Sequence, residues 1–326
     1  MKRVDELIIK QRKIPIKIKK LEALLRRLPM SHSKWKEVVA EAARSWAGYR
    51  GEESLDYYLS FLPDKEYFIF HDLRIPYKTH HFQMDFLIQT NYFLLILEVK
   101  NISGTITFDP DLNQMIRTLN GIEEAFPDPV QQVKHQQFQL SSLLQQKKYK
   151  NVPIESLVVM ANPYSLLKMP AKRPDYLQKV IRSTRLLEKI QFFHKKHKDE
   201  KLTRSELRKI SKLLLINDTP HNPNMLQRFE LSKSDILPGV FCEKCSTMTM
   251  SRSKGSWVCN HCSYSYKNAH LNALEDYSFL INSTISNSET RKFLQLSSSS
   301  VAQKLLKTSN FTPTGTTKDR RYHLYC

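Results

Sequence analysis

The feature that most constrains this chain is a pair of apolar segments that contain charged residues. Residues 83–100 predict two buried strands joined by a short turn. The first strand contains Asp85, and the second ends in Glu98 and Lys100 after a run of Phe, Leu and Ile, which favours a central place in a sheet. Because side chains two residues apart in a strand lie on the same face, we expect Glu98 and Lys100 to lie side by side.

Burial of two carboxylates and an ammonium group is unfavourable unless the groups pair or hold a cation. Two acidic side chains suit Mg²⁺ or Mn²⁺, and a neighbouring ammonium group suits a water or a phosphate. The pattern therefore predicts a divalent metal site. The alternative is a structural ion pair in a scaffold that binds other proteins.

Short motifs on both sides of these strands resemble the nuclease-related domain (NERD) family of the PD-(D/E)xK nuclease superfamily. The resemblance extends over about residues 48–165, and Asp128 stands where the family pattern has Asn. It implies an α/β fold, a restriction-endonuclease-like mixed sheet flanked by helices. The matching motifs are Gly51-Glu52, Asp85, Glu98-Val99-Lys100-Asn101 with Gly104, and Pro129-Val130-x-Gln132-x-x-His135.

The resemblance implies that Asp85 and Glu98 bind Mg²⁺ or Mn²⁺, with the main-chain carbonyl of Val99 as a further ligand. It also places Glu52 near the metal, bound directly or through water. Glu52 directly follows Gly51, and we prefer it for this reason to its neighbour Glu53. A solvated helix face is the alternative for Glu52, because glutamates in helices are usually exposed.

Two further residues have roles under the same resemblance. Lys100 would position the attacking water or stabilise negative charge at phosphorus. Gln132, on a helix predicted to begin near Pro129, would hold the phosphate or the water. His135 and Gln136 lie about one helical turn further on and could face the same site, and His135 is the weaker candidate. A solvated helix face is again the alternative for these helical residues.

The length of 326 residues allows one large core and one or two small modules. Changes in composition, together with residues that break helices and strands, divide the chain into five expected segments. These are a basic helical segment at 1–45, the nuclease-like domain at 46–218, a Pro-rich linker at 219–237, a zinc ribbon at 238–268, and a helical domain at 269–326.

Four of the five cysteines form two Cys-x-x-Cys pairs that are separated by about 13 residues. This spacing predicts a structural Zn²⁺ site with four thiolates, and it resembles a zinc ribbon with a hairpin turn at Lys254-Gly255. The alternative, two redox motifs, lacks the βαβ context that such motifs require. The predicted ligands are Cys242, Cys245, Cys259 and Cys262.

The C-terminal segment predicts a helix, a second and third helix joined by a serine-rich turn, and a basic hairpin. This order resembles a winged helix-turn-helix, whose second helix of the pair enters the DNA major groove. The alternative is a small helical interaction domain without a DNA role. The cations that favour phosphate contact are Lys304, Lys307, Lys318, Arg320 and Arg321.

A net charge of +19 favours a polyanionic partner. Nucleic acid, chiefly DNA, is the first candidate, an anionic membrane surface the second, and a merely basic surface the third. No apolar segment approaches the roughly 20 residues of a membrane span, and the N-terminus lacks the apolar core of a signal peptide. We therefore expect a cytoplasmic protein without membrane insertion, in keeping with two cysteine pairs spaced for metal.

Together these features predict a metal-dependent nuclease that hydrolyses phosphodiester bonds of DNA, or of RNA, and that a zinc ribbon and a DNA-binding tail direct to its substrate. The alternative is a nucleic-acid-binding or regulatory protein that has the nuclease fold but does not cleave.

Overall fold

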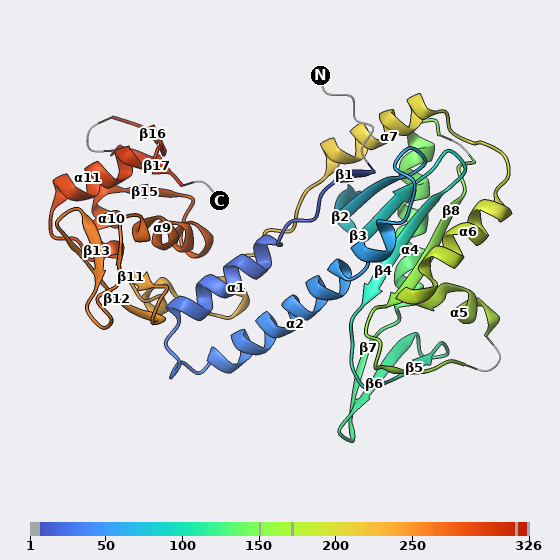
Figure 1. Cartoon of the computed structure of the whole chain (residues 1–326), viewed down its shortest axis with the longest axis horizontal. Coiled ribbons are helices and arrows are strands. Elements are labelled where there is room, and N and C mark those ends of the chain that lie inside the picture. The colour runs from blue at the N-terminus through green and yellow to red at the C-terminus, as the bar shows by residue number, and fades with distance from the viewer. Residues whose placement is uncertain (1–6, 150, 171–172, 317–318, 325–326) are drawn as a thin grey trace. The chain divides into compact units, whose positions relative to one another are not determined.

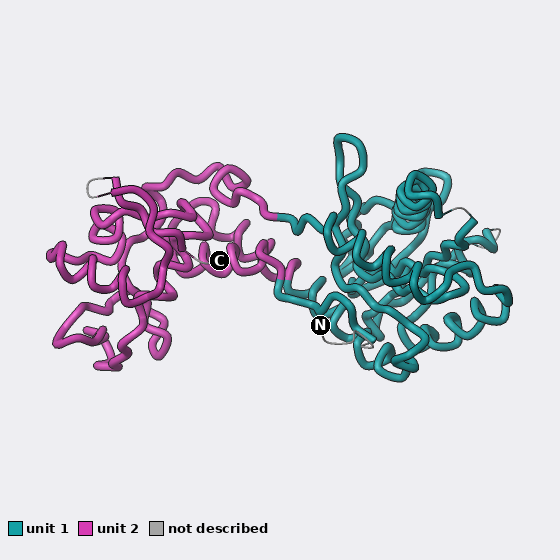
Figure 2. The backbone as a smooth tube through the Cα atoms, turned by 90° about the horizontal axis from the view of Figure 1, so that it is seen from above, with its two compact units in different colours: residues 1–14, 46–221 teal, residues 15–45, 222–326 magenta. Residues whose placement is uncertain are grey.

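A computed structural model describes residues 7–149, 151–170, 173–316 and 319–324. The chain divides into two compact units, shown in different colours in Figure 2. Unit 1 comprises residues 1–14 and 46–221, and unit 2 comprises residues 15–45 and 222–326. Among the residues that the structure describes, no helix combines the length and the apolar character of a membrane span.

Unit 1 is built on a six-stranded mixed sheet (Figure 1). Neighbouring strands follow the order β1-β2-β3-β4-β8-β10, in which β2, β3 and β4 are antiparallel and the other pairs are parallel. The mixed sheet predicted for the nuclease-like domain is confirmed. Its strands are β1 (Ile8–Lys10), β2 (Phe68–Tyr77), β3 (His80–Gln89), β4 (Leu94–Lys100), β8 (Ile154–Met160) and β10 (Val180–Arg182).

The central strand β4 is buried on both sides because helices cover both faces of this sheet. Leu95 and Leu97 belong to an apolar cluster on one face, which also includes side chains of α3 and α6. Leu94 and Ile96 point the other way, into a cluster with α4 and α7. The helices are α3 (Asp56–Leu59), α4 (Pro129–Gln146), α6 (Leu186–Lys196) and α7 (Arg204–Asn217).

A second sheet of unit 1 has the order β7-β6-β5-β9. The hairpin that joins β6 to β7 turns at Asn120-Gly121, and both residues have the positive φ of a tight primed turn, 51° and 76°. Its strands are β5 (Thr105–Asp109), β6 (Gln114–Leu119), β7 (Ile122–Pro127) and β9 (Leu166–Lys168). The remaining elements of unit 1 are α5 (Pro174–Lys179) and a 3₁₀ turn at Ser183–Arg185.

Helix α2 (Trp35–Glu53) begins in unit 2 and ends in unit 1. Its N-terminal half contributes Val38 and Ala42 to the core of unit 2. Its C-terminal half lies against Asn101, because a Cβ atom at Gly51 would collide with the Asn101 side chain. Only glycine permits this approach, which brings the end of α2 to the end of β4.

Unit 2 contains a four-stranded sheet, β11-β12-β13-β14, and a three-stranded sheet, β15-β17-β16. The hairpin expected at Lys254-Gly255 joins β12 to β13, with positive φ at both residues. The elements of this unit are α1 (Ile16–Arg27), α8 (Met225–Arg228), a 3₁₀ turn at Lys233–Asp235, β11 (Val240–Cys242), β12 (Thr247–Ser253), β13 (Ser256–Cys259), β14 (Ser265–Tyr266), α9 (Ala269–Leu280), β15 (Thr284–Ser286), α10 (Asn287–Leu294), α11 (Ser299–Thr308), β16 (Thr312–Thr314) and β17 (Arg321–His323).

The structure differs from the expected segments at two places. The expected linker at 219–237 contains α8, and Met225 and Phe229 lie in the core of unit 2. The expected N-terminal segment is divided, since β1 joins the sheet of unit 1 while α1 packs in unit 2. The prolines that suggested a linker, Pro220, Pro223 and Pro238, lie outside α8, before and after these buried residues, where a fixed φ is compatible with packing.

An ion pair fixes α1 within unit 2. Asp276 of α9 is 1% exposed and accepts from Arg27 at 2.8 Å and from Arg26 at 2.6 Å. The Arg27 guanidinium also lies 4.3 Å from the centre of the Phe293 ring and donates to the main-chain oxygen of Leu237. Buried charges persist only when they are paired and hydrogen-bonded in this way, so α1 is an integral part of this core.

Candidate active site

Asp85 and Glu98 lie where the pairing of β3 with β4 ends. The antiparallel register pairs Leu87 with Ile96 and Phe86 with Leu97, and Asp85 and Glu98 are the next residues of the two strands. The Asp85 side chain reaches the main chain of Val99, and the charge of Glu98 raises the pKa of Asp85. The two carboxylates therefore lie close together at the end of β4.

Beyond the last paired residues of β3 and β4, side-chain hydrogen bonds take the place of the main-chain hydrogen bonds between the strands. Asp85 Oδ2 accepts the main-chain N–H of Val99 at 2.7 Å. Lys100 Nζ donates to Glu98 Oε1 at 2.6 Å. The two residues that alternation placed on one face of the strand are therefore in direct contact.

Helix α4 covers this group of charges with two glutamines, one helical turn apart. Its position is set by Asp128, whose side chain caps the helix by accepting the N–H of Val130, with Pro129 in the first turn. Gln132 Oε1 accepts from Lys100 Nζ at 3.1 Å. Gln136 Nε2 donates to Glu98 Oε2 at 2.8 Å.

The structure separates the three polar residues of α4 that the sequence placed together. Gln132 and Gln136 contact the charged group, whereas the side chain of His135 is exposed to solvent. Gln136 is 4% exposed, and its Oε1 is a buried atom without a hydrogen-bond partner in the described part of the chain. Buried polar atoms are usually hydrogen-bonded, so this oxygen is free to accept from a donor or to bind a cation.

Glu52, at the end of α2, is held by Arg12 from the N-terminal segment. Arg12 donates to Glu52 Oε2 and to Asp56 Oδ1, both at 2.8 Å, and its side chain is 6% exposed. The same guanidinium contacts His71 Nδ1 at 2.7 Å and lies 4.8 Å from the centre of the Phe86 ring. Burial and Arg12 lower the pKa of His71 to about 4, so its neutral ring accepts this hydrogen bond.

Burial and neighbouring charges shift the pKa of Asp85, Glu52 and Lys100. Burial raises the pKa of Asp85 well above its usual value, and the charges of Glu98 and Glu52 raise it further. Burial also raises the pKa of Glu52 to about 7, although Arg12 acts in the opposite direction. Burial lowers the pKa of Lys100, but the attraction of Glu98 and Asp85 outweighs this effect and the net pKa is raised. The group therefore has an excess of negative charge that a cation would relieve.

These residues fit a hexacoordinate divalent ion held by a few protein oxygens. In the described part of the chain, only the four cysteines have three or more potential ligand atoms within 4.8 Å of one another. Asp85, Glu98 and Glu52 are thus not close enough to surround an ion as three direct ligands. Mg²⁺ prefers one or two carboxylates and retains several waters, which agrees with a site formed by Asp85 and Glu98.

The sequence did not reveal two charged residues near this site, Arg12, which pairs with Glu52, and Asp72, whose charge raises the pKa of Glu52. Arg12 lies 40 residues before Glu52, and no local pattern marks it. Asp72 has a positive φ of 51° in the middle of β2, and it accepts from Gln83 Nε2 at 2.6 Å. Burial raises the pKa of Asp72 as well. A non-glycine residue in the left-handed region is uncommon, but sequence alone does not reveal it.

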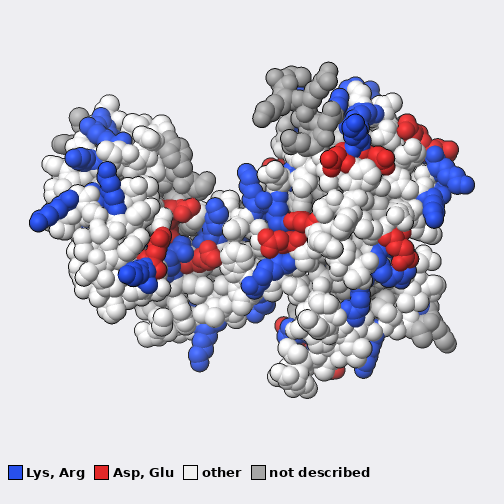
Figure 3. Space-filling model, in the orientation of Figure 1, with Lys and Arg blue, Asp and Glu red and all other residues white. Residues whose placement is uncertain are grey.

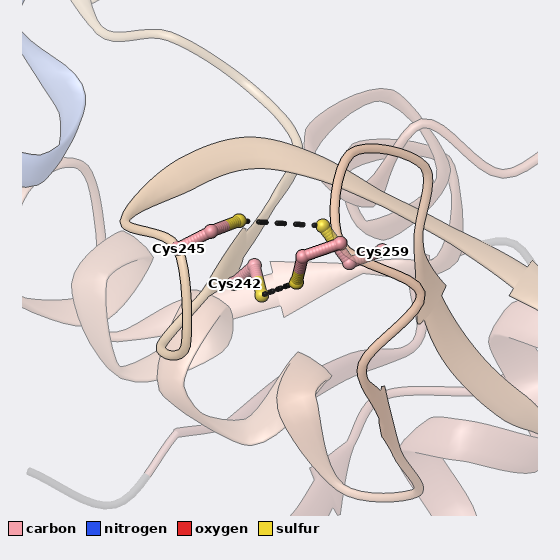
Figure 4. A group of neighbouring side chains, drawn as sticks. Cys242, Cys245 and Cys259 are labelled. Atoms are coloured by element: carbon pink, nitrogen blue, oxygen red, sulfur yellow. Dashed lines mark hydrogen bonds between the residues drawn. The ribbon is translucent and has the colours of Figure 1, made fainter.

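The four predicted zinc ligands converge in unit 2 (Figure 4). The Sγ atoms of Cys242 and Cys262 are 3.7 Å apart, and those of Cys245 and Cys259 are 3.5 Å apart. Thiolates at about 2.3 Å from a tetrahedral Zn²⁺ lie about 3.8 Å from one another. The donor set and its spacing are therefore compatible with a zinc ribbon, and no disulfide joins these thiols.

The C-terminal part of unit 2 has the element order of a winged helix-turn-helix. Helices α10 and α11 form the pair, and β16 and β17 form a hairpin that pairs with β15. Lys304 is exposed on α11, whereas Arg321 is paired with Glu289 at 2.9 Å. Lys318 lies outside the described residues.

Unit 1 is a mixed α/β domain with a group of acidic side chains at the end of a central strand. Residues 47–161 match the family model described as Nuclease-related domain, NERD, which confirms the resemblance that the sequence motifs indicated. The match covers about a third of the chain and includes β2, β3, β4, β8 and α4. Comparison with curated proteins and comparison with solved structures found no match.

Proposed function

We propose that unit 1 is a divalent-metal-dependent nuclease that hydrolyses phosphodiester bonds of DNA. The observation that supports this proposal is the grouping of Asp85, Glu98 and Lys100 at the end of β4, inside the segment that matches the nuclease-related family. The excess of negative charge at this point suits a cation. The net charge of +19 suits a polyanionic substrate.

Asp85 and Glu98 would hold Mg²⁺ or Mn²⁺, with the Val99 carbonyl and Glu52 as further oxygen donors, directly or through water. The bound ion would supply an activated water and neutralise phosphate charge. Lys100 would stabilise the negative charge that develops on the phosphate oxygens. Gln132 orients Lys100, since its Oε1 accepts from the ammonium group.

Unit 2 would provide most of the affinity for nucleic acid. The four-cysteine cluster would bind one structural Zn²⁺, and the winged helix-turn-helix would contact DNA through α11 and the hairpin. Figure 3 shows Lys and Arg side chains spread over both units, with Asp and Glu gathered in fewer places. Such binding is expected to weaken steeply as salt rises.

The second candidate function is nucleic-acid binding without cleavage. A specific observation favours it, because both oxygens of Glu98 already have partners. Lys100 occupies Oε1 and Gln136 occupies Oε2. A metal ion would have to compete with these contacts, and a chain in which they persist would bind DNA without cutting it.

Cleavage of plasmid and single-stranded DNA, with Mg²⁺ or Mn²⁺, separates the two functions. We expect metal-dependent cutting by the wild type and none by Asp85→Ala or Lys100→Ala. Glu53→Ala is the matched control, because this exposed neighbour of Glu52 removes one carboxylate outside the site. Cleavage that survives Asp85→Ala would refute the catalytic assignment. Binding without cutting under both metals would establish the second function.

A further inference from the structure

A cavity of about 860 Å³ lies within unit 2, between the ribbon and the C-terminal helices. Three elements line it: the turn of the β12–β13 hairpin, the start of α9, and α11. We call it the ribbon–helix groove. It is separate from the cysteine cluster, since none of the four cysteines lines it.

The charged residues of the ribbon–helix groove are all cations. They are Arg252, Lys254, Lys267 and Lys304, and no Asp or Glu is among the lining residues that the structure describes. The three lysines are exposed. Among the described residues, none of these ammonium groups has a carboxylate partner within ion-pair distance, whereas Arg26, Arg27 and Arg321 of the same unit are paired. Their charges thus remain available to an anion.

A chain of hydrogen bonds holds the three walls together. Trp257 of β13 donates from Nε1 to His270 Nδ1 of α9 at 3.2 Å. His270 Nε2 contacts Ser309 Oγ at 3.3 Å, and Ser309 donates to the main-chain oxygen of Leu305 at 2.7 Å. Burial lowers the pKa of His270 to about 4, so the neutral ring accepts on one nitrogen and donates on the other.

The cationic wall is held by the same group of residues. The Arg252 guanidinium lies 5.5 Å from the centre of the buried Trp257 ring and donates to the main-chain oxygen of Lys267 at 3.2 Å. The ribbon and α11 are therefore fixed to one another before any ligand arrives. A site that is already ordered loses less conformational entropy on binding.

We propose that the ribbon–helix groove binds the phosphate backbone of a nucleic-acid strand. The ribbon and α11 would then act as one interface, with Lys254 and Lys267 of the ribbon side and Lys304 of α11 contacting phosphates of the same strand. Charge complementarity and the absence of acidic lining residues favour this occupant over a protein segment. The inference rests on the nucleic-acid partner of the proposed function, but it does not depend on cleavage.

The test measures binding of a short fluorescent DNA duplex by the full chain in the Asp85→Ala background, without Mg²⁺, Mn²⁺ or chelator. The variant combines Lys254→Ala, Lys267→Ala and Lys304→Ala. We expect an affinity loss of at least about tenfold near 0.1 M salt, and a plot of log K against log salt that is less steep by about 2 to 3. Replacement of the same three lysines by arginine should preserve both values.

The matched control removes three exposed lysines of unit 2 that do not line the groove, Lys36, Lys233 and Lys292. An equal loss in this control would overturn the proposal, because the effect would then reflect net charge alone. Unchanged affinity in the groove variant would overturn it as well. Zinc content is measured in every variant, and no zinc ligand is altered. Because binding is measured without cleavage, an inactive unit 1 would leave the outcome interpretable.

Discussion

Replacement of Glu52 by glutamine tests the electrostatics of the acidic site without any substrate. The pKa of Glu52 rises from 4.5 to about 7 in the folded chain. Between these two values the folded state keeps a proton that the unfolded state has lost. A rising pH therefore favours unfolding in this window, and the loss of stability is complete above about pH 7.

The magnitude follows from the size of the pKa change. A rise of about 2.5 in pKa corresponds to about 3 kcal/mol of unfolding free energy. Solvent reduces this value, because the side chain of Glu52 keeps 24% of its surface exposed. Glutamine preserves the size of the side chain and cannot ionise, so Glu52→Gln should be more stable than the wild type above about pH 7 and nearly equal to it near pH 4.5.

The assay is urea unfolding of metal-free protein at several pH values between these limits. Glu53→Gln is the matched control, since it makes the same change at the next, exposed position of α2. Mg²⁺ or Mn²⁺ should raise the stability of the wild type most at high pH, where the carboxylates are ionised. If the wild type and Glu52→Gln show parallel pH profiles, or if Glu53→Gln has the same effect, the reasoning is wrong.

Three other substitutions have defined outcomes. Arg12→Met should lower the free energy of unfolding by about 3 to 5 kcal/mol, because it leaves two partly buried carboxylates unpaired, and equal urea midpoints for Arg12→Met and the wild type would contradict this. Cys245→Ser should lose bound zinc, measured by metal analysis, and make unit 2 more sensitive to protease; a variant that retained about one zinc would exclude the four-thiolate site. Trp257→Phe should lose about 1 to 3 kcal/mol by leaving His270 without its donor, and unchanged hydrogen exchange at α9 would show that this bond contributes nothing.

Local patterns were sufficient for the parts of the fold that depend on neighbouring residues. The alternation of side chains along a strand predicted that Glu98 and Lys100 share a face, and in the structure Lys100 Nζ lies 2.6 Å from Glu98 Oε1. Asn-Gly pairs favour tight primed turns, and Asn120-Gly121 occupies a hairpin turn. Thr203 and Glu206 have the spacing of a capping box, and they form one. In each case the determining contacts span only a few residues, so sequence periodicity contains them.

Contacts between distant segments explain what the sequence did not reveal. Strand β1 pairs with β2, about sixty residues later, and this pairing brings Arg12 to Glu52. A three-residue edge strand is too short for the alternation of apolar and polar side chains to predict it. The Pro-rich stretch after residue 219 was expected to be a linker, yet Phe229 is 1% exposed. A few apolar residues between prolines do not by themselves predict burial, because the elements that cover them come from distant parts of the chain.

Because the chain passes between the units three times, after residues 14, 45 and 221, its domains do not correspond to continuous stretches of the gene. A fragment that starts at residue 222 would lack α1, and Asp276 would remain in an apolar interior without either arginine. Protease cleavage after residue 221 would likewise release no tail, since α1 would still hold the C-terminal fragment. Deletion variants intended to separate the proposed DNA binding from the proposed catalysis must therefore keep residues 15–45 with the C-terminal half, joined by a new connection.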